Sequence, residues 1–229
     1  MILDFERRKA KYTPIAQTLY AVFGRPTWRQ SLPPLDELID CILSQSTTDL
    51  NKDRAFAALK ARFASWDLVM NAPLELVIET IRPSGLAHQK APIIQEVLRR
   101  IQAERGELNI DFLADVPMDE AKAWLTSFKG VGPKTAAIVL CFGFNRSAFP
   151  VDTHIHRVGQ RIGFLPANIS ADKAHPVMES IVPPADHYTF HLNLIRLGRE
   201  ICQARRPKCE VCPLTAYCDY YKSMTYGES

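Results

Sequence analysis

A lysine follows a glycine-rich turn in the stretch FKGVGPKTAAIVLCF, which runs from Phe128 to Phe142. Pro133 suits the first position of a helix, so the apolar residues behind it predict a helix with Lys134 in its first turn. An amine is a nucleophile only when neutral, and at an ordinary pKa near 10.4 roughly one lysine in a thousand is neutral at about pH 7.4. A positive helix end and burial in a cleft both disfavour the ammonium, so the position predicts either a reactive amine or a cationic contact to phosphate.

The residues in front of this lysine predict a helix-hairpin-helix motif. The stretch DEAKAWLTSF from Asp119 predicts the first helix. The turn that follows consists of Lys129, Gly130, Val131 and Gly132. Its glycines allow unusual backbone dihedrals and close approach of a ligand, and the unpaired N–H groups at the start of the second helix fit a DNA phosphate. A plain helical turn with a glycine cap is the alternative, which a GxG pattern alone favours.

An aspartate begins another helical pattern in the stretch FPVDTHIHRVGQRIG from Phe149. The position of Asp152 predicts an N-cap, whose side chain accepts hydrogen bonds from backbone N–H groups. A carboxylate held by one oxygen stays ionised and can turn the other toward a reacting centre. We therefore predict a helix cap that is compatible with a catalytic role.

Four of the six cysteines share one short segment with the spacing C-x6-C-x2-C-x5-C: Cys202, Cys209, Cys212 and Cys218. Four thiolates suit tetrahedral zinc or a 4Fe–4S cluster, and general frequencies favour zinc as the commoner structural metal. Cys41 and Cys141 stand alone among apolar neighbours and are predicted to pack in the core.

The densest basic patch accompanies these cysteines: Arg196, Arg199, Arg205, Arg206 and Lys208. The chain has a net charge of +3. A cluster with a +2 core bound by four thiolates would add about −2 and leave about +1. Attraction to DNA would then depend on this local patch and on backbone amides.

The composition is that of an ordinary globular protein, with 47% hydrophobic residues among 229. The N-terminus lacks the pattern of a secretion signal, and no apolar run approaches the roughly 20 residues that span a bilayer. We expect a cytoplasmic protein with no membrane contact.

Helical periodicity extends over nearly every segment, as at Ile93, Ile94, Val97, Leu98 and Ile101. Breaks occur at SLPP, RPSG, GVGP, FPVD and VPP, and a new helical pattern follows each. The sequence therefore predicts an all-α protein.

In their order and spacing, GVGPKTA, an aspartate 18 residues after the lysine in VDTHIHRV, and the four cysteines resemble the endonuclease III family of HhH-GPD DNA glycosylases. The resemblance covers nearly the whole chain. It implies a two-lobed all-α fold with a C-terminal 4Fe–4S cluster held by the four cysteines. Residues 30–146 would form a central helical domain containing the hairpin, and residues 1–29 with 147–229 a discontinuous domain carrying the cluster. A bacterial cytoplasm or nucleoid is the implied location, and a monomer the implied state.

The resemblance also implies a reaction on damaged double-stranded DNA, removing oxidised pyrimidines such as thymine glycol. Lys134 would attack C1′ of the damaged nucleotide, expel the base and form a Schiff base, and β-elimination of the 3′ phosphate would follow. Asp152 would activate the lysine and stabilise positive charge on the sugar, which agrees with the physical interpretation of both residues.

Two further segments resemble loops that enter the duplex when the target nucleotide leaves the stack. LSQSTTDLN offers Gln45 or, because the glutamine is displaced by one residue from the family pattern, Ser46. GLAHQKA offers Leu86 as a wedge, with Ala87 where an aromatic is common. Lys129 replaces the usual proline of the hairpin.

Two other readings remain open. A monofunctional, adenine-glycosylase-like enzyme shares the aspartate and the cluster but typically lacks the lysine, and Asp40 lies near where such enzymes keep an acidic residue. A non-catalytic protein that recognises DNA structure is the second, although binding phosphate does not require the pair of Lys134 and Asp152.

Overall fold

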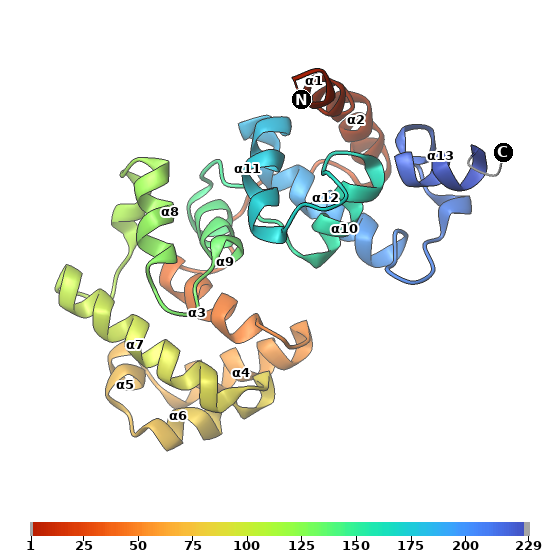
Figure 1. Ribbon diagram of the computed structural model, residues 1–229. Coiled ribbons are helices and arrows are strands. Elements are labelled where there is room, and N and C mark those ends of the chain that lie inside the picture. Colours follow the sequence, from red (N-terminus) through yellow and green to blue (C-terminus); the bar gives the residue numbers. More distant parts are fainter. Residues whose placement is uncertain (1, 227–229) are drawn as a thin grey trace. The chain divides into compact units, whose positions relative to one another are not determined.

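The computed structural model describes residues 2–226, and the regular elements among them are all helical (Figure 1). This confirms the predicted all-α class. None of the described helices combines the length and apolar character needed to cross a membrane. The chain forms two compact units, one of residues 30–146 and one of residues up to 29 together with those from 147 onward.

The unit of residues 30–146 is built around α3 (Pro34–Ser44) and α7 (Ala87–Arg105). Leu38 and Ile42 of α3 and Ile94 of α7 are fully buried, and the two helices pack together. The other elements are α4 (Asp49–Arg62), α5 (Trp66–Asn71), α6 (Leu74–Ile81), η1 (Arg82–Ser84), η2 (Asp111–Ala114), α8 (Met118–Thr126), α9 (Pro133–Ile138) and the π-helix η3 (Val139–Gly143). The apolar periodicity of the sequence thus supplies one helical core.

Local sequence rules account for the ends of several of these helices. Thr48 caps α4 by accepting from Asn51 N at 3.3 Å, and Ser65 caps α5. Gly106 ends α7 with a φ of +78°, a conformation that glycine adopts without strain. Cys41 and Cys141 are buried, in agreement with their predicted packing role.

The second unit has an aromatic centre formed by residues distant in sequence. Phe149, Phe164 and Phe190 are fully buried, and the rings of the first two lie 6.4 and 6.1 Å from that of Phe190. The helices around them are α1 (Ile2–Ala10), α2 (Tyr12–Phe23), α10 (Thr153–Ile162), α11 (Ala171–Ile181), α12 (His187–Glu200) and α13 (Asp219–Tyr226), with short turns η4 (Pro184–Asp186), η5 (Cys209–Val211) and η6 (Thr215–Tyr217).

Contacts to α12 join the N-terminal segment to this unit. Thr189 Oγ1 donates to the carbonyl of Pro26 at 2.8 Å, and Asn193 Nδ2 donates to that of Gly24 at 3.0 Å. The ring of Tyr12 meets that of Phe190 edge to face at 5.1 Å. The first helices therefore belong to the same core as the C-terminal half of the chain.

Candidate functional site

The hairpin between α8 and α9 is a tight turn. Val131 N donates to Phe128 O at 3.1 Å, and Gly130 has a φ of +82°. Gly132 instead has extended backbone, with φ −95° and ψ 179°, and is the N-cap of α9. Our expectation of unusual dihedrals thus holds for Gly130 and is wrong for Gly132, because only the first glycine reverses the chain. A side chain at Gly132 would meet no atom within 4 Å, so the protein itself does not require glycine there.

Lys134 is the second residue of α9, as the sequence predicts for the residue after Pro133 at the first helical position, and its side chain is exposed. The next three residues, Thr135 to Ala137, are buried and fix the helix to its unit. The helix continues into the π-helix η3 (Val139–Gly143). Lys134 therefore presents its amine outward from a firmly packed helix start.

An acidic group that the sequence analysis did not identify lies beneath this helix. The thiol of buried Cys41 approaches Glu37 Oε1 at 3.9 Å, and α3, which carries both, packs against α9. Burial, with a contribution from Asp40, raises the pKa of Glu37 to about 7. Burial also raises the pKa of Cys41, while the charge of Lys134 acts in the opposite direction. Nothing in the sequence marks Glu37, since acids are common in the first turn of a helix.

Asp40, the residue considered for an adenine-glycosylase-like role, has a structural partner. Its Oδ2 lies 2.8 Å from Lys52 Nζ, and both side chains are mostly buried. Burial raises the pKa of Asp40 and the ion pair with Lys52 opposes that increase. The carboxylate is thus engaged inside its own unit.

The two predicted duplex-entering segments both belong to the unit of residues 30–146. Gln45 turns toward the hairpin, and its Nε2 donates to Gly130 O at 2.8 Å. Ser46 is exposed and has a φ of +52°. Leu86 is 49% exposed and has a φ of +49°. Non-glycine residues rarely adopt this conformation, so both segments hold an outward residue at some cost in backbone strain.

Asp152 is the N-cap of α10, as predicted. Its Oδ1 accepts from Ile155 N at 2.7 Å, and the residue is half-buried. Within the described part of the chain, Oδ2 has no protein partner. The carboxylate is therefore fixed by one oxygen and open at the other. Lys134 belongs to the unit of residues 30–146, and Asp152 to the other unit.

The four clustered cysteines line one cavity, together with Leu197, Leu214 and Tyr220 among others. All four are free thiols. Burial raises the pKa of Cys209, Cys212 and Cys218, so thiolates there require compensating positive charge. Four soft sulfur donors around one apolar hollow suit a cofactor bound by thiolates.

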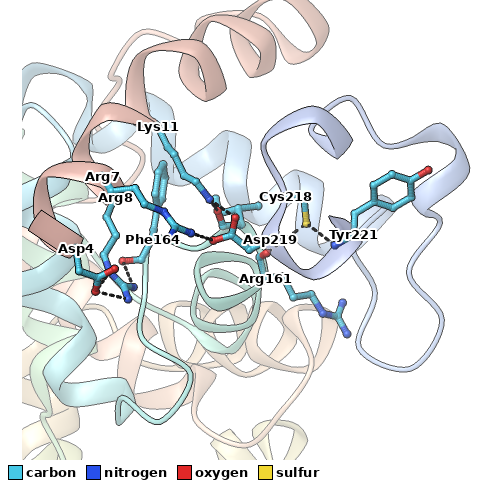
Figure 2. Close-up of polar contacts among 10 residues, drawn as sticks. Asp4, Arg7, Arg8, Lys11, Arg161, Phe164, Cys218, Asp219 and Tyr221 are labelled. Carbon is cyan, nitrogen blue, oxygen red and sulfur yellow. Dashed lines mark hydrogen bonds and ion pairs between the residues drawn. The ribbon is translucent and has the colours of Figure 1, made fainter. Parts of the chain in front are cut away.

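N–H donors already point at two of these sulfurs. Arg161 Nη1 donates to Cys202 Sγ at 3.4 Å. Cys218 Sγ accepts from Tyr221 N at 3.5 Å, and the Cys218 thiol donates to the Arg161 carbonyl at 3.3 Å (Figure 2). The two N–H bonds favour thiolate over thiol, which metal binding requires, whereas the bond to the Arg161 carbonyl favours the thiol and is lost when the proton leaves.

The basic loop that follows Cys202 is held by the same arginine. Arg161 donates to Gln203 O at 2.7 Å and to Ala204 O at 2.8 Å, and Lys208 N donates to Ile201 O at 3.0 Å. The predicted DNA contacts in this loop are all exposed: Arg205, Arg206 and Lys208. The role of Arg161, 41 residues before Cys202, could not be found from sequence spacing.

Comparison with known proteins places this arrangement in a class. Residues 39–184 match the model of HhH-GPD superfamily base excision DNA repair proteins, and residues 202–218 match the iron–sulfur binding domain of endonuclease III. The chain therefore belongs to the HhH-GPD superfamily. The second match begins at Cys202 and ends at Cys218, the first and last of the four cysteines. It identifies the cofactor as a 4Fe–4S cluster, not the zinc that general frequencies favour.

Within the superfamily, the proteins to which the chain is similar include DNA glycosylases and endonuclease III. A putative DNA glycosylase of Arabidopsis thaliana is 39% identical over 81% of this chain and 66% of its own length. Endonuclease III of Sulfolobus acidocaldarius is 32% identical over 80% of this chain and 81% of its own. A trapped endonuclease III–DNA covalent intermediate has a TM-score of 0.79 at 28% identity, covering 94% of this chain and 98% of that one.

Proposed function

We propose that this endonuclease III-like glycosylase of base excision repair is bifunctional, removing oxidised pyrimidines such as thymine glycol from duplex DNA and then cutting the abasic site as a lyase. The observation that carries the proposal is the exposed amine of Lys134, presented from α9 directly behind a turn built to approach a ligand. A protein that only binds phosphate has no need of this lysine together with Asp152, whose carboxylate has one oxygen bonded and the other open.

In the proposed reaction, the neutral amine of Lys134 forms a bond to C1′ while the bond from C1′ to the base breaks and the base takes up a proton. The sugar ring opens to give a Schiff base. Loss of a C2′ proton then expels the 3′ phosphate by β-elimination. The trapped covalent intermediate with DNA belongs to endonuclease III, and we extend its chemistry to this chain because the two are similar over nearly their whole lengths.

Asp152 is proposed to act through its second oxygen. Oδ1 is occupied at the α10 N-terminus, where it accepts the hydrogen bond from Ile155 N. Oδ2 can then accept a proton from Lys134 or stabilise the positive charge that develops on the sugar. The cap and the catalyst are thus two uses of one carboxylate.

DNA binding is proposed to use three groups of residues. The first is the hairpin from Lys129 to Gly132, which would bind a phosphate through backbone N–H groups other than that of Val131, whose N–H donates to Phe128 O. The second comprises the residues that would fill the duplex beside the flipped nucleotide: Gln45, Ser46 and Leu86. The third is the basic loop: Arg205, Arg206 and Lys208. Because Gln45 is already bonded to Gly130 O, we assign the space vacated by the nucleotide to Ser46 first.

The cluster is proposed to be held by Cys202, Cys209, Cys212 and Cys218. The cluster would hold the basic loop in a fixed conformation and set the charge around it. Base excision itself needs no redox step from the cluster.

The test is borohydride trapping on duplex DNA that contains either thymine glycol or an abasic site. Wild type should give a covalent adduct on both substrates, and Lys134→Gln on neither. Lys173→Gln, which changes an exposed lysine in the other unit, is the matched control and should trap normally. An adduct on the abasic site alone would leave a lyase with a different base substrate, and no adduct on either would overturn the Schiff-base mechanism.

A further inference from the structure

Lys90 is a buried lysine that the proposed reaction does not use. It lies in the first turn of α7, with only 2% of its surface exposed. Nζ donates to Leu43 O at 2.7 Å and to Ser84 O at 2.8 Å. No carboxylate pairs with it among the described residues. Burying an ammonium without a counter-ion costs free energy, and the hydrogen bonds to these two carbonyls must offset that cost.

The two carbonyls lie at the bases of the two candidate duplex-entering segments. Leu43 is in the last turn of α3, where its carbonyl lacks a partner within the helix. Ser84 ends η1. Ser46 follows the first carbonyl by three residues, and Leu86 follows the second by two. Among the described non-glycine residues, Ser46 and Leu86 are two of the three with positive φ. The ammonium of Lys90 therefore links the backbone just before Ser46 to the backbone just before Leu86, and both of these outward-facing residues have strained dihedrals.

The chemistry of the contact suits positioning. The C-terminal end of α3 carries partial negative charge, which an ammonium stabilises, and three N–H donors allow a single Nζ to bind two carbonyls at once. A methionine has nearly the same length and would fill the same space, but would leave both carbonyls unsatisfied. The spacing between the two segments is then no longer fixed by a direct link.

We propose that Lys90 is a positioning residue that sets the spacing between Ser46 and Leu86, so that both enter a damaged duplex together without reorganisation. The proposal rests on the proposed function. Lys90 does not contact DNA in this arrangement, because its amine is buried and already bonded twice. Lys90 therefore increases the affinity for a damaged duplex and does not change the affinity for intact DNA.

The experiment measures affinity for two duplexes, one intact and one with a tetrahydrofuran abasic analogue that cannot be cleaved. Lys90→Met should lower the affinity for the analogue at least tenfold and leave that for intact DNA within about twofold. Because each phosphate contact adds about −0.9 to the slope of log K against log salt, the slope should stay unchanged in Lys90→Met. Lys129→Met, which changes an exposed hairpin lysine, is the matched control: it should weaken both duplexes equally and reduce that slope.

A second readout separates positioning from general support of the fold. In a Leu86→Ala background, Lys90→Met should cost less than threefold in affinity for the analogue, because the residue it positions is already absent. If Lys90→Met does not fold, Lys90→Gln keeps a donor for one carbonyl and is expected to show a smaller loss of the same preference. Circular dichroism and cluster absorbance report whether each variant is folded.

The outcomes are distinct. A wild type that does not prefer the analogue to intact DNA would overturn the proposed function and this proposal with it. A wild-type preference that the folded Lys90→Met or Lys90→Gln variant retains would overturn the role of Lys90 alone. Loss of affinity for both duplexes with a reduced salt slope would identify Lys90 as a phosphate contact and also overturn it.

Discussion

The hairpin before Lys134 and the segment of clustered cysteines, Cys202–Cys218, obtain their shapes in different ways. The turn of the hairpin follows mainly from its own residues, since Gly130 reverses the chain and Pro133 begins the helix, with one long-range hydrogen bond from Gln45. The cysteine segment contains little regular structure, and Arg161 of α10 holds its first loop through the carbonyls of residues 203 and 204. The hairpin is therefore a local motif, whereas the cysteine segment depends on a residue distant in sequence.

This difference predicts different sensitivities. A substitution in the hairpin should act through backbone conformation and remain local. A substitution in the cysteine segment should remove the cofactor and, with it, the order of the whole basic loop, because residues 203–208 are mostly exposed and form no helix of their own.

Removing one cysteine of the segment should have the largest effect. Cys209→Ala is expected to lose iron, to lower the free energy of unfolding by at least about 3 kcal/mol, and to weaken binding of intact DNA at least tenfold. Iron content, visible absorbance and thermal unfolding measure this. The matched control is Cys141→Ala, which removes a buried thiol from the other unit and should retain iron.

The same variant tests whether the two regions are independent. At saturating abasic-site DNA, Cys209→Ala should still form the borohydride adduct, because Lys134 belongs to the unit of residues 30–146. A fully stable variant with normal DNA affinity would contradict the supporting role of the segment. Loss of trapping at saturation would show that the reaction of Lys134 depends on the unit that holds the cluster, which also carries Asp152.

The two units should also differ in their response to pH. Burial raises the pKa of Glu37 to about 7, so between about pH 4.5 and 7 the folded state holds a proton that the unfolded state has lost. Stability of this unit therefore falls as pH rises through that range. Glu37→Gln removes this penalty and should be more stable than wild type by about 3 kcal/mol at pH 8, with little difference at pH 4.5.

In the other unit the sign is opposite. Burial alone would raise the pKa of Asp186, but hydrogen bonds from Tyr12 and Arg25 outweigh it and lower that pKa. The stability from this group is present at neutral pH and is lost as pH falls through the lowered pKa. Urea unfolding across pH measures both effects. The control is Glu79→Gln, on a largely exposed side chain: a gain in stability over wild type that grows with pH as much as that of Glu37→Gln would contradict the assignment to Glu37.

Within the hairpin, the two glycines should respond unequally. Gly130→Ala forces a φ of +82° on an alanine and brings its Cβ to 3.0 Å from Ile93 Cδ1, so it should cost about 1 to 2 kcal/mol of stability. Gly132→Ala meets extended backbone and open space and should leave stability nearly unchanged. If the turn approaches a phosphate closely, Gly132→Ala should nevertheless weaken DNA binding. Thermal unfolding and duplex affinity separate the two, and equal destabilisation would contradict the backbone argument.

These contrasts show what the sequence could and could not predict. The helical class, the proline at the start of α9 and the cap at Asp152 follow from rules that act within a few residues. Gly132 was misassigned because a GVG pattern does not say which glycine takes the positive φ. Glu37, Lys90 and Arg161 were not identified, since burial and a partner about 40 or more residues away leave no mark on local spacing.

The smallest effect should come from the contact between the end of the cysteine segment and α1 and α2. Asp219, next to Cys218, lies 2.5 Å from Lys11 Nζ and 3.4 Å from Arg7 (Figure 2). The carboxylate is about one-third exposed, so solvent weakens the pair, and Asp219→Asn should cost about 1 kcal/mol or less. Lys11 keeps the Ile162 carbonyl as an acceptor, which limits the loss. The variant should retain full iron content, measured beside its unfolding midpoint and that of Asp4→Asn, an exposed ion-pair control in α1. Loss of iron from Asp219→Asn alone would show that the fold around the last cysteine depends on the N-terminal helices, and the long-range character of this segment would then extend to its cofactor.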